Sequence, residues 1–154
     1  MWGRTWLTRD MTLTRISALA LLTAASAVAL TGCAIGDTLN NEKVTEFSTS
    51  AELVDTWSKS APWLPTDATD IVTRETPDAE PAVLLATSEH SLDPELCIEV
   101  ERKSGPVFSV DGAPNAYVDT VFACGDWAVI ATDDGWYGWT PNHPDEQAAS
   151  DRLN

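Results

Sequence analysis

The chain has 154 residues, enough for one domain, and carries 24 Asp and Glu against nine Lys and Arg, a formal net charge of −15. From residue 33 onward six basic side chains face 23 acidic ones. A field of that sign repels phosphate backbones and anionic membrane surfaces, so we expect no nucleic-acid ligand and no electrostatic attraction to lipid. Hydrophobic residues make up 44% of the chain and seven are Trp, which predicts a folded acidic domain instead of a disordered tail.

Residues 1–32 have the pattern of a secretory signal peptide. Arg15 is the last charge before residues 16–30, which are uncharged and mostly apolar. A basic segment, an apolar segment of this length and small residues before the cleavage site define such a leader. The sequence also offers Met11 as the true start, with the same mature protein. An uncleaved membrane span is the alternative, because the uncharged run continues to Gly36, but the small residues near its end favour cleavage.

The leader ends in the four residues Leu30-Thr31-Gly32-Cys33. An aliphatic residue, a small residue, Gly and Cys in this order resemble the lipobox of bacterial lipoproteins. The resemblance implies a diacylglyceryl group on the sulfur of Cys33 and cleavage just before it. A thiolate is a strong nucleophile, which suits lipidation, and two acyl chains anchor a protein stably. We therefore expect a lipid-anchored, extracytoplasmic protein on the outer face of the cell membrane, with no cofactor besides this lipid.

Two further cysteines remain for a compartment in which disulfides persist. Cys97 and Cys124 permit one pairing, and closing that loop would restrict the unfolded chain by roughly 3–4 kcal/mol. A zinc site that added His90 and His143 is the alternative. No pair among the four shows the short spacing of structural zinc ligands. We predict a Cys97–Cys124 disulfide and no metal site.

The chain after the leader divides into a tether, a domain and a tail. Residues 33–48 are polar and are interpreted as a flexible tether that follows the lipidated cysteine. The domain is expected over residues 49–144, and residues 145–154 form a polar C-terminal tail. The first expected element is a short helix within residues 48–62. Its cap would be Ser48 or Ser50, and its apolar face would contain Leu53, Val54 and Trp57.

Four strands are expected in the domain. They lie near residues 70–75, 82–88, 126–132 and 136–140, which are short runs rich in β-branched, apolar or aromatic residues. The last two form a hairpin, because Asp133-Asp134-Gly135 between them is a turn signal. From 98 to 118 Gly and Pro interrupt the pattern. The predicted fold is α+β: one N-terminal helix packed on a small antiparallel sheet of about four strands, with a C-terminal Trp-rich hairpin and one disulfide.

Candidate catalytic residues are few. Only His90 and His143 offer an imidazole base, and neither neighbours a nucleophile elbow such as Gly-x-Ser-x-Gly. Acids are plentiful, but a glycosidase also needs an aromatic-lined cleft that so small a domain would struggle to build. The Asp- and Gly-rich turns do not match a calcium-binding loop. We therefore expect a protein that is not an enzyme.

Four aromatic residues near the C-terminus are the strongest sign of a ligand platform: Trp127, Trp136, Tyr137 and Trp139. Strand alternation places Trp136 on the opposite face from Tyr137 and Trp139, so at least one large ring should face outward. The alternative is a Trp-rich core. The segment also resembles the hairpin of bacterial SH3-type cell-wall-targeting modules. The matching residues are Gly125, Trp127, Gly135, Gly138 and Trp139, and Ile130 stands one position away from the expected Val.

Taken whole, the chain resembles the small acidic lipoproteins of actinobacteria. Two functions stay open. A non-catalytic protein-interaction or accessory module at the cell surface predicts an exposed apolar patch and no deep polar pocket. A cell-wall glycan-binding module that uses the hairpin 125–140 predicts outward-facing rings beside hydrogen-bonding side chains such as Asp126 or Asn142. We favour a protein partner over wall glycan.

Overall fold

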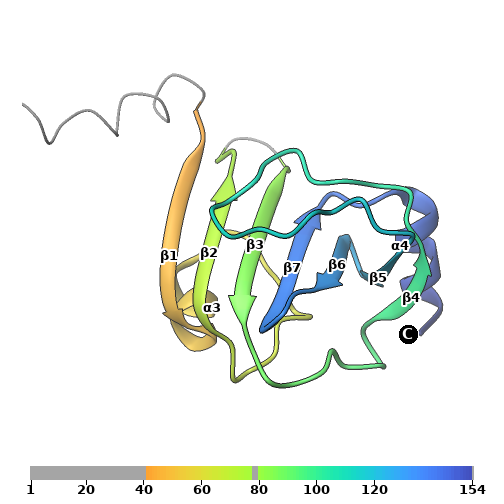
Figure 1. Cartoon of the computed structure of the whole chain (residues 1–154), viewed down its shortest axis with the longest axis horizontal. Coiled ribbons are helices and arrows are strands. Elements are labelled where there is room, and N and C mark those ends of the chain that lie inside the picture. The colour runs from red at the N-terminus through yellow and green to blue at the C-terminus, as the bar shows by residue number, and fades with distance from the viewer. Residues whose placement is uncertain (1–40, 78–79, 154) are drawn as a thin grey trace, which may run out of the picture. The chain divides into compact units, whose positions relative to one another are not determined.

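A single antiparallel sheet organises the domain (Figure 1). The computed structural model describes residues 41–77 and 80–153. The strands of the sheet lie in the order β1-β2-β3-β7-β6-β5-β4. The strands are β1 Lys43–Thr49, β2 Thr69–Glu75, β3 Ala82–Thr87, β4 Ile98–Glu101, β5 Thr120–Cys124, β6 Trp127–Ala131 and β7 Gly135–Thr140. The described residues also form two short helices, α3 Ser50–Thr56 and α4 Pro144–Ser150, and a 3₁₀ turn, Asp151–Leu153.

The predicted fold class is wrong, because the described chain is mostly β and its sheet has seven strands instead of about four. Strands β2, β3, β6 and β7 lie where strands are expected. β1 shows no apolar alternation, since Phe47 is its one buried residue. β4 is only four residues long and has no buried residue, because Ile98 and Val100 are half-buried and Glu99 and Glu101 are exposed. β5 lies just after the Gly- and Pro-rich stretch that obscures the pattern.

The ends of the domain also differ from the predicted boundaries. Residues 43–48, assigned to the tether, form most of β1, which pairs with β2. The expected polar tail contains α4, in which Glu146 and Ser150 are buried. The leader, Cys33 and the tether up to residue 40 lie outside the described residues. Within the described ranges, no helix is long and apolar enough to cross a membrane.

The helix α3 begins where a helix is expected, with a different cap. Its N-cap is Thr49, whose hydroxyl accepts a hydrogen bond from the Glu52 amide, instead of either predicted serine. Leu53 and Trp57 are buried as predicted. Val54 is 75% exposed, so its place on the apolar face was predicted wrongly. The helix thus buries only Leu53 and its C-cap residue Trp57.

Both faces of the sheet are covered. On one face, α3 and the chain after it contribute Leu53, Trp57, Ala61, Trp63 and Ala68 to the core. Residues 102–119 lie on the other face. This stretch, here called the crossing segment, joins β4 to β5. Figure 1 shows it (teal) running over the strands as far as β2. It packs Phe108, Val110, Ala113, Ala116 and Val118 against the strands.

A glycine on β7 marks a close contact between the α3 side and the sheet. A Cβ atom at Gly138 would lie 2.5 Å from Cζ2 of Trp63 and 3.2 Å from Cε3 of Trp127. Gly138→Ala must therefore displace a buried indole, and we expect it to lower the free energy of unfolding by about 1–3 kcal/mol. Gly105→Ala is the control, because its Cβ would meet nothing closer than 4.0 Å. Urea unfolding curves of both variants, showing equal midpoints, would contradict this expectation.

Candidate functional site

Three of the four predicted platform residues belong to the core. Trp127, Tyr137 and Trp139 are each 1% exposed. The Trp127 ring packs against the rings of Trp57 and Trp63. The polar atoms of the three residues are used internally: Trp127 Nε1 donates to Ser60 O, Tyr137 OH to Phe108 O, and Trp139 Nε1 to Ser104 Oγ. The expectation of an outward ring fails for these three because both faces of the sheet are covered.

Trp136 keeps part of its ring at the surface. Its indole N–H donates to the His90 carbonyl at 2.9 Å, and its ring meets Phe122 edge-on with centroids 5.8 Å apart. It lines an open hollow of about 480 Å³ beside the β6–β7 turn, here called the hairpin-end hollow. The polar side chains around it include Glu89, His90, Thr132, Asp133 and Asp134. The lining of the hollow is therefore mainly polar and includes three acids.

Next to this hollow, Asp67 joins Ser88 and His90. The Ser88 hydroxyl donates to one Asp67 oxygen at 2.7 Å, and His90 Nδ1 lies 2.9 Å from the other. Hydrogen bonds from His90 and Ser88 hold the pKa of Asp67 well below its usual range, and the Asp67 carboxylate raises the pKa of His90. In a hydrolase the imidazole lies between the serine and the acid. Here the carboxylate of Asp67 lies between the serine and the histidine. This arrangement fixes the positions of the three side chains and does not place the imidazole to activate the serine.

The second histidine is part of a helix cap. His143 Nδ1 accepts from the Asp145 amide at 3.1 Å, and the His143 amide donates to the Glu146 carboxylate at 2.9 Å. This reciprocal pattern is a capping box at the start of α4. In residues 41–77 and 80–153, no group of three or more His, Cys, Asp or Glu side chains is arranged to hold a metal ion.

Glu146 is a buried carboxylate that ties α4 to the crossing segment. It is 1% exposed and accepts hydrogen bonds from the amides of Lys103, Ser104 and His143 and from the Ser104 hydroxyl. Burial raises the pKa of this carboxyl, but the hydrogen bonds outweigh burial, so its pKa lies below the usual value. The Ser104 hydroxyl accepts in turn from Trp139. Glu146 thus fixes the start of the crossing segment.

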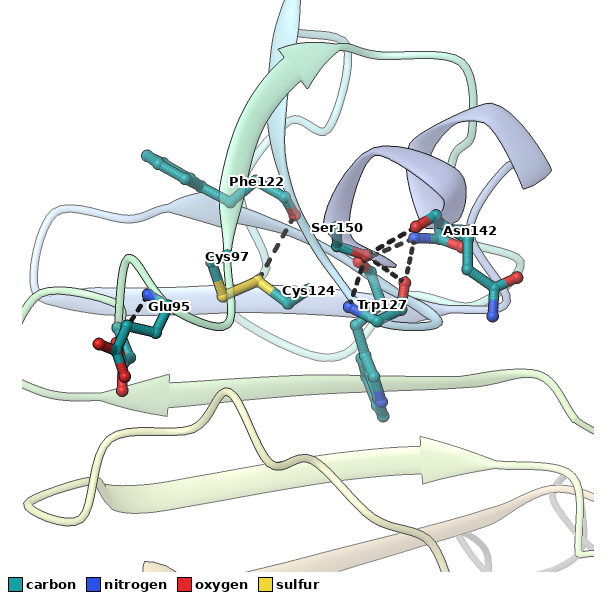
Figure 2. Close-up of a disulfide and its surroundings, with 10 residues drawn as sticks. Glu95, Cys97, Phe122, Cys124, Trp127, Asn142 and Ser150 are labelled. Atoms are coloured by element: carbon teal, nitrogen blue, oxygen red, sulfur yellow. Dashed lines mark hydrogen bonds between the residues drawn. A yellow bond between two sulfur atoms is a disulfide. The ribbon is translucent and has the colours of Figure 1, made fainter. Parts of the chain in front are cut away.

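The predicted disulfide is confirmed: Cys97 and Cys124 are bonded, and both are buried (Figure 2). It joins the residue before β4 to the last residue of β5. Close by, the Gly125 backbone amide donates to the Ser150 hydroxyl, and the side-chain amide of Asn142 donates through Nδ2 to the Gly125 carbonyl (Figure 2). Asn142, expected beside outward rings, therefore binds the turn between β5 and β6.

A second hollow lies within the crossing segment and is here called the crossing groove. Its volume is about 380 Å³, and it is lined by Arg102, residues 105–109 and 114–117, and Tyr137 of β7. Val107 and Tyr117 on these walls are 68% and 87% exposed. Large apolar and aromatic side chains exposed beside a concave surface are typical of a binding site. The sequence prediction did not include this groove, although apolar residues between its Gly and Pro turns were a visible signal.

Two arginines hold the walls of the crossing groove. Arg102 donates to two backbone carbonyls of the crossing segment, at 2.7 and 2.9 Å, and its guanidinium carbon lies 5.6 Å from the Tyr117 ring centroid. Arg74 of β2 donates to the Ser109 carbonyl at 3.0 Å and lies 5.8 Å from the Phe108 ring centroid. These contacts order a segment that has neither helix nor strand of its own.

The two hollows differ in chemistry. The hairpin-end hollow is lined mainly by polar and acidic side chains around one partly covered indole. The crossing groove combines exposed apolar side chains with one arginine on a well-anchored frame. Comparisons with protein-family models, with curated proteins and with solved structures found no match to this chain.

Proposed function

We propose that this chain is an extracytoplasmic lipoprotein, anchored to the cell membrane through lipid on Cys33, whose domain is a non-catalytic protein-interaction module. The leader and the lipobox-like Leu30-Thr31-Gly32-Cys33 support the anchor. The strong negative charge of the domain favours a lipid anchor over electrostatic attachment to an anionic surface.

The crossing groove is the proposed docking surface, and the exposure of Tyr117 and Val107 beside it is the observation that carries the proposal. Tyrosine supplies a large contact area at little cost in conformational entropy, and aromatic residues are enriched in protein interfaces. The Tyr117 ring is exposed but contacts the Arg102 guanidinium, and its backbone amide donates to Asn115 Oδ1. A partner would therefore meet a pre-ordered surface, which reduces the entropic cost of binding.

Binding of cell-wall glycan is the second candidate, favoured by Trp136 beside the acids of the hairpin-end hollow. Sugar rings stack on an open aromatic face beside hydrogen-bonding side chains. The indole N–H of Trp136 is already bonded to His90, and Phe122 covers part of the ring. The glycan proposal thus depends on one partly available ring, whereas the protein proposal depends on a shaped groove.

Photo-cross-linking in living cells distinguishes the two. Replacing Tyr117 with p-benzoylphenylalanine should yield one discrete adduct between the full lipidated chain and another polypeptide. The control replaces Val54, which is similarly exposed but lies on α3, outside the groove, and should not yield that adduct. The same replacement at Trp136 tests the glycan candidate. Absence of a protein adduct at position 117, with wall glycan joined at position 136, would overturn the protein-partner proposal.

A further inference from the structure

The crossing groove differs in charge from the rest of the domain. From residue 33 onward the chain carries six basic and 23 acidic side chains. The groove is lined by Arg102 and by no acidic side chain. Because exposed charges separated by more than the Debye length of about 8 Å are largely screened, a ligand inside the groove responds less to the distant acids of the domain than to the charges close to it. A local positive site therefore lies on a strongly negative domain.

The guanidinium of Arg102 keeps donors for a ligand. Its Nε and Nη1 donate to the carbonyls of Val118 and Ser104, while Nη2 donates to no atom of the described residues. These carbonyls fix the position of the cation without neutralising its charge. Asn115 accepts from the Tyr117 amide through Oδ1, so its side-chain NH₂ is a second donor in the lining. Two sets of donors in a lining that contains no carboxylate suit an anionic acceptor.

The remaining lining determines what can carry that anion. Val107, Tyr117 and the prolines at 106 and 114 present apolar surface around the groove. Its volume of about 380 Å³ is near the lower end of typical ligand pockets, which run to about 1,000 Å³. Such a space accepts a few neighbouring side chains of an extended chain, and a whole helix would be too wide at about 10 Å.

We propose that the crossing groove binds an extended segment of a partner protein that places a carboxylate against Arg102 and an apolar side chain beside Tyr117. This inference rests on the proposed function and adds the chemistry of the partner. The carboxylate supplies specificity, because elsewhere on this domain an acidic segment meets like charge. The apolar neighbour supplies contact area with an exposed ring.

Peptide selection on the full lipidated chain tests the proposal. The probe is a phage-displayed library of random dodecapeptides, panned against the chain in lipid nanodiscs. We expect selected peptides to be enriched in an Asp or Glu close to Pro or aliphatic residues. The strongest peptide is then synthesised with its acid and with the matching amide. Fluorescence anisotropy should give about tenfold weaker binding for the amide peptide, since a charged hydrogen bond is lost from an unaltered protein.

Protein variants then locate the site. Tyr117→Ala should weaken binding of the acidic peptide about tenfold, and Val54→Ala, at a residue that is also largely exposed but lies outside the groove, should not change it. Arg102→Gln should remove the difference between the acid and the amide peptide. Peptides that bind equally well as acid and amide, or that ignore Tyr117→Ala, would overturn the inference about the partner while leaving the protein-interaction proposal standing. That proposal fails separately, through the cross-linking at position 117.

Discussion

Replacing Glu146 with alanine is expected to lower the free energy of unfolding by about 3–5 kcal/mol, because each buried donor left without a partner costs about 1–3 kcal/mol. The carboxylate accepts from three backbone amides and one hydroxyl, and it is buried. Water entering the space would satisfy part of this set, which keeps the expected loss below the full sum. Typical domains have only about 5–15 kcal/mol to lose.

The neighbouring acid on α4 is the matched control. Asp145 pairs with Lys103 at 2.7 Å, but both side chains are largely exposed. An exposed ion pair contributes about 0–1 kcal/mol, so Asp145→Ala should change stability by less than about 1 kcal/mol. Both variants are measured by urea unfolding with the disulfide intact. Equal losses for Asp145→Ala and Glu146→Ala would mean that the network around Glu146 does not stabilise the domain.

Because the Glu146 carboxylate is stabilised in the folded domain, we expect the free energy of unfolding to depend on pH. Hydrogen bonds lower the pKa of Glu146 in the folded domain below its ordinary value of 4.5. Its stabilisation is therefore complete above the pKa of the unfolded chain and is lost as the pH falls through the lower, folded value. Glu146→Gln removes this titration. The difference in unfolding free energy between wild type and Glu146→Gln should be larger at pH 7 than at pH 3, and a constant difference would contradict the assignment.

The parts of the fold that the sequence predicted are those with a strong local pattern. β3 and β6 are continuous apolar runs, and the Asp-Asp-Gly turn marks the β6–β7 hairpin. β1 lacked such a pattern because an edge strand with one buried residue, Phe47, resembles a polar linker. The disulfide was predictable because the interpretation of Cys33 as the lipidated residue left two of the three cysteines, which allow one pairing.

The candidate site was harder to predict because it depends on contacts between distant segments. Four of the five residues of β6 are buried, Trp127 among them, and a run of this kind is typical of a strand covered on both faces. That signal argued against an outward Trp127, whose ring is covered by Trp57 and Trp63 on the α3 side. The cover over Tyr137 and Trp139 on the other face comes from the crossing segment, whose Gly and Pro residues concealed its apolar side chains. The burial of Glu146 depends on Lys103 and Ser104, some forty residues earlier, and no local pattern marks it.

Breaking the Cys97–Cys124 disulfide is the second change with a large expected effect. The two cysteines are 27 positions apart, and opening such a loop releases about 3–4 kcal/mol of restraint on the unfolded chain. The folded state is also weakened at a vulnerable place. β4 is an edge strand of four residues that pairs only with β5, and the disulfide holds its start. We therefore expect reduction to lower the free energy of unfolding by about 3–4 kcal/mol.

Urea unfolding with and without a phosphine reductant measures this effect, and amide hydrogen exchange locates it. Exchange should accelerate first in β4 and β5, before the β2–β3 pair at the far side of the sheet. The double variant Cys97→Ala/Cys124→Ala is the control, because it should be less stable and insensitive to the reductant. An unchanged unfolding midpoint for the reduced wild type would show that core packing alone maintains β4. A domain that loses this much on reduction is suited to a compartment where thiols remain oxidised, as the proposed extracytoplasmic anchor requires.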